Sequence, residues 1–180
     1  MSTSIPYNPK TAALLVIDMQ EIFRNDATDI IPNVQSLVKS CHEKGALGRW
    51  WGDRLIKWGS DEWQILKEMQ PFVSRSQTSL DTLDFIIKSK TRYDAFYKTE
   101  LNSLLISLGI ETLIISGVRT NLCCETTARR GFDKNYDIVF ATATENQKMH
   151  EATLLNMEYG WAKIVTAIDV IEWLAHIGKT

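Results

Sequence analysis

Residues 12–18 read AALLVID, six apolar residues in a row that end at an aspartate. An unbroken apolar run without polar alternation is typical of a strand buried on both faces of a parallel sheet. Four later runs resemble it and predict further strands at residues 85–87, 112–115, 138–140 and 163–165. The sequence therefore predicts a sheet of parallel strands.

Helical patterns separate these runs. Between residues 32 and 44, the apolar residues Val34, Leu37, Val38 and Cys41 share one helix face. Similar patterns predict helices over residues 100–108, 121–132 and 147–159. Strands that alternate with helices favour a three-layer α/β/α fold with an open, mainly parallel sheet, formed by residues 1–180 as a single domain. In such sheets ligands bind beyond the carboxyl ends of the strands.

The composition excludes several classes of protein. The chain has 20 Lys and Arg residues and 22 Asp and Glu residues, so no basic face is available to neutralise a nucleic-acid backbone. No apolar run reaches the roughly 18 residues that span a bilayer, and the first residues lack the features of a secretory signal. We expect a cytoplasmic protein with no nucleic-acid or membrane partner.

The cysteines and histidines do not suggest disulfides or a bound metal. The cysteines are three in number, and Cys123 and Cys124 are neighbours that could pair only through a strained ring. None of His42, His150 and His176 stands in a cluster with the spacing of metal ligands. We expect no metal and no organic cofactor, and we expect His150 to make supporting hydrogen bonds.

Three residues with complementary chemistry end strands or begin a helix. Cys123 stands just inside the helix predicted over 121–132, where unpaired N–H groups and the positive helix end favour a thiolate and can hold an oxyanion. Asp18 directly follows the first strand and can act as a base toward the thiol, then as an acid toward a leaving amine. Lys90 can keep both groups charged.

Each of these residues also has a purely structural interpretation. A cysteine in an apolar helix is often an inert buried thiol, an aspartate after a strand often caps a turn, and a lysine within KSKTR often lies in solvent. Residue type and spacing leave both interpretations open.

Four stretches carry a resemblance to a known family: ALLVIDMQEIF at 13–23, KTRYDAFYKTEL at 90–101, IISGVRTNLCCETTAR at 114–129 and MHEATLLNMEYGWAKIVTA at 149–167. In this order they resemble the isochorismatase-like cysteine hydrolases, in particular the nicotinamidase-like branch. In that family the aspartate of the first stretch, the lysine that opens the second and the first cysteine of the third form a catalytic triad. The resemblance thus implies a triad of Asp18, Lys90 and Cys123.

The resemblance implies further detail around the cysteine. It implies a cis peptide bond between Val118 and Arg119, and an oxyanion hole formed by the backbone N–H groups of Arg119 and Cys123. Residues in the segments that line the family's pocket, and expected to bind substrate, are Gln20, Phe23, Trp51, Phe96 and Arg119. Core packing also explains the aromatic ones. Arg119 either binds a substrate carboxylate or points to solvent, and Cys124 is expected to pack in the core.

One segment departs from the family pattern. Relatives have a second buried strand after the first helix, followed by a loop that in metal-binding nicotinamidases supplies an aspartate and histidines. Here residues 46–70 hold four of the six tryptophans and show no clear strand. We therefore expect that strand to be missing after Gly45, which would shift Lys90 by roughly 5 Å relative to Asp18. The tryptophan-rich segment is expected to form a lid, a partner surface, or a helix and loop packed on the sheet.

These features predict a cysteine-dependent hydrolase that cleaves a small carboxamide through a thioester intermediate. Nicotinamide-like amides are the first candidate substrates. A second hypothesis, motivated by the missing strand, is a catalytically impaired relative that serves as a binding or assembly subunit. A third is an ether hydrolase of the isochorismatase type. The resemblance also implies a homo-oligomer.

Overall fold

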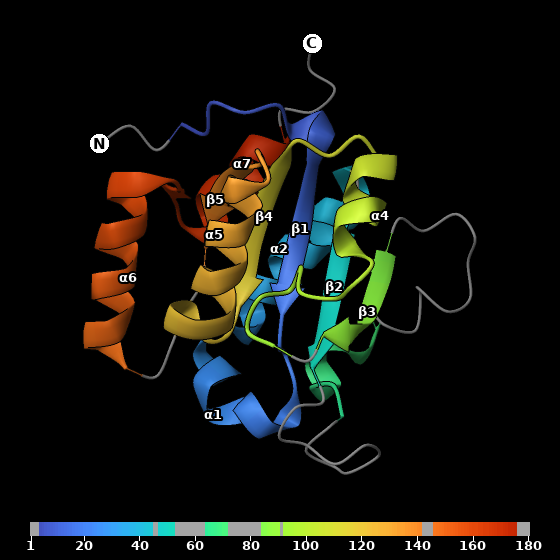
Figure 1. Ribbon diagram of the computed structural model, residues 1–180. Coiled ribbons are helices and arrows are strands. Elements are labelled where there is room, and N and C mark those ends of the chain that lie inside the picture. The colour runs from blue at the N-terminus through green and yellow to red at the C-terminus, as the bar shows by residue number, and fades with distance from the viewer. Residues whose placement is uncertain are drawn as a thin grey trace.

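The computed structural model describes residues 4–44, 47–52, 64–71, 84–90, 92–141 and 146–175. Its centre is a six-stranded sheet of order β3-β2-β1-β4-β5-β6, in which all neighbouring strands are parallel (Figure 1). The strands are β1 (Ala12–Ile17), β2 (Leu47–Gly52), β3 (Asp84–Lys90), β4 (Thr112–Gly117), β5 (Asp137–Phe140) and β6 (Lys163–Ile164). The predicted parallel sheet is confirmed.

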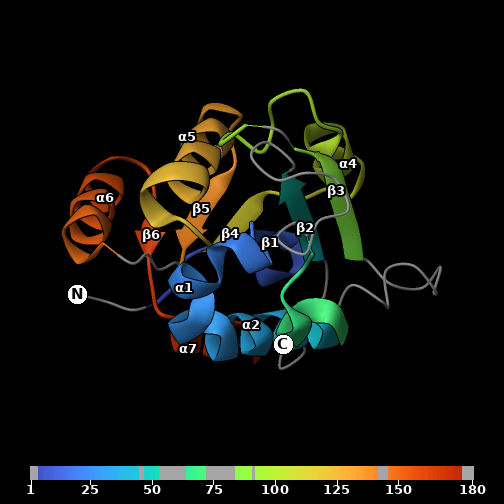
Figure 2. The ribbon, with the colours of Figure 1, turned by 90° about the horizontal axis from the view of Figure 1, so that it is seen from below.

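Helices cover both faces of the sheet and give the molecule three layers (Figure 2). One outer layer contains α1 (Arg24–Ala27), α2 (Ile31–Lys44) and α7 (Ala167–Ala175), and the other contains α4 (Leu101–Ser107), α5 (Glu125–Asp133) and α6 (Gln147–Gly160). The four predicted helices are all present, whereas α7 was not predicted. Within the described ranges, no helix combines the length and apolar character needed to cross a bilayer.

The two central strands, β1 and β4, are buried along their whole length. Alternate residues of β1 serve the two outer layers, because successive side chains of a strand point to opposite faces. Leu14 and Val16 pack with α2 and α7, whereas Leu15 and Ile17 pack with α4 and α5. Ile17 is paired in register with Gly117, so β1 and β4 end at the same level.

The expectation of a missing strand is wrong. β2 lies between β1 and β3, with Leu14 paired to Leu47 and Trp50 paired to Ile87. Its sequence, LGRWWG, does not show the pattern of a buried parallel strand, because two glycines, an arginine and two tryptophans follow the single leucine. The sheet therefore does not close up, and Lys90 is not displaced toward β1.

The ends of β1 and β4 approach so closely that only glycine fits at position 117. Gly117 has a φ of +111°, and a Cβ atom on it would lie 2.1 Å from the backbone oxygen of Ile17. Backbone atoms cannot rotate away as a side chain can. The close contact fixes the point at which Asp18 leaves the sheet, since Asp18 follows Ile17.

We therefore expect Gly117→Ala to lower the free energy of unfolding by at least about 3 kcal/mol. The physical reason is the backbone clash together with the unfavourable positive φ. Gly160→Ala is the matched control, because a Cβ atom at Gly160 has no atom within 4 Å. Chemical denaturation measures both variants, and equal stability of the two would contradict the prediction.

Candidate active site

A buried ion pair joins the ends of β1 and β3. Nζ of Lys90, the last residue of β3, lies 3.0 Å and 2.9 Å from the two carboxylate oxygens of Asp18. Each of the two residues is only 3% exposed. The pair is firmly placed, because separating it would leave a charge in the protein interior without a partner.

The backbone at Asp18 turns sharply away from the sheet. Its φ is +49°, in the left-handed region that aspartate tolerates better than most residues. Its carbonyl oxygen accepts a hydrogen bond of 2.9 Å from the N–H of Gln20. The turn keeps the Asp18 carboxylate at the carboxyl edge of the sheet, where Lys90 also ends its strand.

Cys123 lies in a wide helical turn between β4 and α5. Thr120–Cys124 form a single π-helical turn, and the carbonyl oxygen of Arg119 accepts the N–H of Cys124 at 3.2 Å. The helix predicted over 121–132 is thus present, but it begins with a wider turn than expected. Single π-helical turns are frequent at functional sites.

This turn brings the sulfur of Cys123 to the ion pair. The Asp18 carboxylate, the Lys90 ammonium and the backbone N–H of Arg119 all lie close enough to the sulfur to shift the pKa of the Cys123 thiol. The Val118–Arg119 peptide bond is cis, as the sequence resemblance implies. Three residues that are distant in the sequence, Asp18, Lys90 and Cys123, therefore meet at one edge of the sheet.

Cys123 holds its proton in the free protein. Burial raises the pKa of the thiol and the Asp18 carboxylate raises it further, whereas the Lys90 ammonium and the Arg119 N–H lower it by less. Burial alone would lower the pKa of Lys90, but the Asp18 carboxylate and the nearby cysteines together offset this, so the pKa of Lys90 is raised. The expected thiolate is therefore wrong for the resting site, because desolvation and Asp18 outweigh the helix end.

Alkylation of Cys123 should consequently require alkaline pH. We expect its rate with iodoacetamide to keep rising above about pH 8.5, the ordinary pKa of a free thiol. Asp18→Asn should shift this dependence to lower pH, because it removes the nearby negative charge. Peptide mass spectrometry measures the rate for each cysteine separately. A rate that is already maximal at neutral pH would contradict a neutral thiol.

Three of the residues expected to bind substrate lie near this site. Gln20 is buried two residues after Asp18, and Phe23 ends the short helix η2 (Glu21–Phe23). The guanidinium of Arg119 lies 5.7 Å from the centre of the Phe23 ring. Arg119 is half-buried, and its side chain lies over this aromatic ring.

The other two residues have different positions. The ring of Phe96 stacks on Tyr136, with 6.1 Å between the ring centres. Tyr136 precedes β5, whereas the ion pair lies where the strands end, so this contact faces the opposite end of the sheet. We therefore assign Phe96 to the core and correct its expected place in the substrate site. Trp51 belongs to β2, and its side chain lies outside the described part of the structure.

Thr120 was not among the residues that the sequence indicated. Its hydroxyl lies 3.0 Å from Nδ1 of His150 on α6, so the expected supporting hydrogen bond of His150 is present. The one local signal is the place of Thr120 within the TNLCC segment that contains Cys123. Its partner comes from a separate helix, and sequence patterns do not show which side chains of two helices meet.

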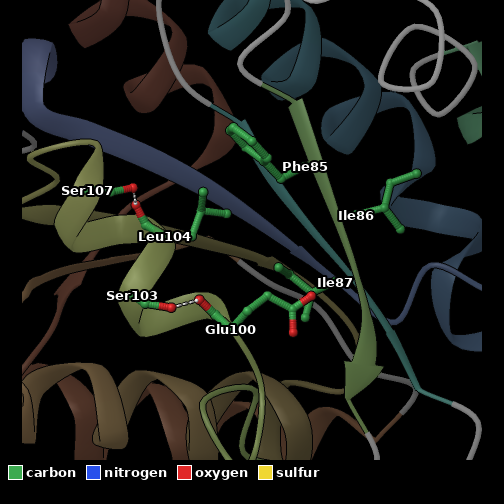
Figure 3. A pocket seen from close by; sticks show the side chains of 7 residues that line it. All are labelled: Phe85, Ile86, Ile87, Glu100, Ser103, Leu104 and Ser107. Carbon is green, nitrogen blue, oxygen red and sulfur yellow. Dashed lines mark hydrogen bonds between the residues drawn. The ribbon is translucent and has the colours of Figure 1, made fainter.

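Elsewhere the described structure offers an apolar groove but no cluster of metal ligands. The groove, of about 430 Å³, lies between β3 and α4 (Figure 3). It is lined from β3 by Phe85, Ile86 and Ile87 and from α4 and the residue before it by Glu100, Ser103, Leu104 and Ser107. In the described ranges, no three His, Cys, Asp or Glu side chains gather as a metal ion would require.

Comparison with known proteins decides the family. The isochorismatase domain matches this chain over residues 12–169. The chain belongs to the isochorismatase family. Among relatives of the family, nicotinamidase 3 of Arabidopsis thaliana is 37% identical over 178 residues, covering 88% of this chain and 86% of the relative. A ureidoacrylate amidohydrolase of Serratia proteamaculans is 28% identical over 205 residues, covering 90% of this chain and 83% of the relative.

Solved structures agree with this isochorismatase-family fold. A cysteine hydrolase from Pseudomonas syringae superposes with a TM-score of 0.82, and 96% of each chain is covered. The two sequences are 19% identical, so this likeness concerns the fold. Together with the family match, it confirms the resemblance that the sequence motifs indicated.

Proposed function

We propose that this isochorismatase-family protein is a cysteine-dependent hydrolase of small carboxamides, with nicotinamide-like amides as the first candidates. The observation that carries the proposal is the buried ion pair of Lys90 with Asp18, whose carboxylate lies close enough to Cys123 to raise the pKa of its thiol. Two relatives that match most of the chain are named as a nicotinamidase and an amidohydrolase, which supports amide chemistry.

The first half-reaction would break the amide bond. Because the resting thiol is neutral, Asp18 must take its proton as the sulfur of Cys123 attacks the carbonyl carbon. The N–H groups of Arg119 and Cys123 would hold the oxyanion that forms. As the carbon–nitrogen bond breaks, Asp18 returns the proton to the departing nitrogen, and ammonia leaves behind a thioester on Cys123.

The second half-reaction would release the acid. A water molecule attacks the thioester carbonyl while Asp18 accepts one of its protons, and the same two N–H groups hold the second oxyanion. The carbon–sulfur bond then breaks, Asp18 returns the proton to the sulfur, and a carboxylic acid departs. Lys90 keeps Asp18 paired throughout. The sum is amide plus water giving acid plus ammonia, so the scheme requires no cofactor.

Arg119 and Phe23 are proposed to contact the rest of the substrate. The backbone N–H of Arg119 lies close enough to the sulfur to lower the pKa of the Cys123 thiol, so the Arg119 side chain starts near the reacting atoms. Its guanidinium lies over the Phe23 ring, an arrangement that suits a flat substrate or one that carries a carboxylate. Gln20 is proposed to complete this side of the site.

The hypothesis of an impaired subunit has lost the observation that motivated it. It depended on a missing strand and a displaced Lys90, but β2 is in place and Lys90 contacts Asp18. The ether-hydrolase hypothesis predicts different products from amide hydrolysis, so a product assay distinguishes the two reactions.

The direct test is ammonia release by the purified protein. Nicotinamide serves as a neutral aromatic amide and ureidoacrylate as one that carries a carboxylate, and kcat/KM is compared between them. Release of ammonia with the matching acid supports the proposal, and the preferred amide indicates what Arg119 recognises. Cleavage of isochorismate without amide turnover would favour the ether hydrolase, and no turnover of any of the three would favour the impaired subunit.

A further inference from the structure

A hydrogen bond links the turn that carries Cys123 to helix α6. Oγ1 of Thr120, the first residue of the π-helical turn, lies 3.0 Å from Nδ1 of His150. Thr120 has no exposed surface, and His150 is half-buried in the first turn of α6. The contact is therefore largely shielded from water, where a hydrogen bond is stronger than at the surface.

Helix α6 is fixed on both sides of this contact by other hydrogen bonds. The side chain of Asn146 caps the helix by accepting the N–H of Met149 at 3.1 Å, and Nδ2 of Asn121 lies 3.3 Å from the sulfur of Met149. One turn further on, the hydroxyl of Thr153 donates to the carboxylate of Glu125 at 2.9 Å. The histidine is thus presented to the turn from a helix with a fixed position.

The turn itself carries the groups that the proposed reaction needs. Thr120 directly follows Arg119, whose backbone N–H lies close enough to the sulfur of Cys123 to lower the pKa of the thiol. The carbonyl oxygen of Arg119 accepts the N–H of Cys124, so the last residue of the turn is tied to the residue that precedes the turn. A rotation of the backbone at Thr120 would displace the Cys123 sulfur relative to the Arg119 N–H, because Thr120 lies between these two residues in the chain.

We propose that His150 is a positioning residue, which by holding the Thr120 hydroxyl keeps the Arg119 N–H and the Cys123 sulfur in the geometry for attack on the amide. This inference rests on the proposed function. His150 acts only through Thr120 and does not touch the reacting atoms. A misplacement of about 1 Å lowers the rate of the chemical step far more than it weakens substrate binding.

The imidazole suits this role because it is neutral near pH 7. Burial lowers the pKa of His150, and the Glu151 carboxylate offsets only part of that effect. A neutral imidazole has one donor and one acceptor nitrogen. The threonine hydroxyl can donate or accept, so either tautomer completes the bond at Nδ1.

Steady-state kinetics of four variants test the proposal with the amide that the wild type turns over best. His150→Ala and Thr120→Val should each lower kcat about tenfold, with KM changed by less than about twofold. The double variant should be no slower than either single variant, because both remove the same hydrogen bond. His150→Asn should recover most of kcat, since its amide can bond where Nδ1 did.

Thr153→Ala is the matched control, because it removes a hydrogen bond that α6 makes to Glu125 of α5 and not to the turn that contains Cys123. It should lower the Tm but leave kcat within about twofold of the wild type. If His150→Ala and Thr120→Val behave like Thr153→Ala, with a lower Tm and normal kcat, the hydrogen bond only anchors the helix. Additive losses in the double variant would also overturn the proposal.

A second measurement separates this inference from the proposed function. The rate of Cys123 alkylation by iodoacetamide reports the surroundings of the sulfur without any substrate. His150→Ala and Thr120→Val should change that rate at least about threefold, and Thr153→Ala should leave it unchanged. A protein that hydrolyses no amide would refute the function, and alkylation unchanged in both variants would refute the positioning by His150.

Discussion

Cys123→Ala should abolish ammonia release, with kcat/KM lowered at least about 10³-fold. The Asp18 carboxylate and the Arg119 N–H both lie close enough to the sulfur of Cys123 to shift the pKa of its thiol, and no other atom of this side chain can form the thioester. The measurement is ammonia release from the preferred amide at saturating and limiting concentrations. Circular dichroism establishes that the variant remains folded.

Cys124→Ala is the control that the chain itself provides. Cys124 is the next residue and is also a buried thiol, but it has no exposed surface and packs in the core. We expect this variant to keep kcat/KM within about threefold and to lose about 1 kcal/mol of stability through the small cavity. Activity that survives in Cys123→Ala but is lost in Cys124→Ala would show that the nucleophile has been misassigned.

Asp18→Asn is expected to be the second severe change, lowering kcat about 10³-fold, because an amide can neither take the thiol proton nor return it to the leaving group. It should also lower the free energy of unfolding by about 3 kcal/mol, since the Lys90 ammonium stays buried without its carboxylate. Ammonia release and urea denaturation measure the two effects separately.

The double variant Asp18→Asn with Lys90→Met separates stability from chemistry. It replaces the ion pair by two neutral side chains of similar size, so we expect most of the lost stability to return. Activity should stay as low as in Asp18→Asn, because the base is still missing. A double variant that regains activity along with stability would mean that Asp18 supports the fold only and takes no part in proton transfer.

The part of the fold that could be predicted is the part with a plain apolar pattern. The runs AALLVI and TLIISG are buried on both faces, and only strands inside a parallel sheet demand such composition. The run LGRWWG gives no such signal, because it combines two glycines and an arginine with two tryptophans, and its place between β1 and β3 is known only from its pairing with both neighbours. β2 could therefore be found only in three dimensions.

The meeting of the candidate residues could also be anticipated, because parallel strands end at one edge. Asp18 follows β1, Lys90 ends β3, and Cys123 comes soon after β4. The protonation of Cys123 could not be anticipated in the same way. It depends on how close the Asp18 carboxylate comes to the sulfur and on how much solvent is lost, and neither is a property of the local sequence.

Lys90 reaches the site from β3, which in the described sheet is an outermost strand with β2 as its one neighbour, whereas Asp18 and Cys123 follow the two central strands. Outermost strands are the first to fray on warming, because one of their sides lacks backbone partners. Such fraying would withdraw the ammonium group while the interior stays intact. Activity would then be lost at a lower temperature than the one at which the whole fold unfolds. Substitutions that stabilise β3 would raise the temperature of inactivation.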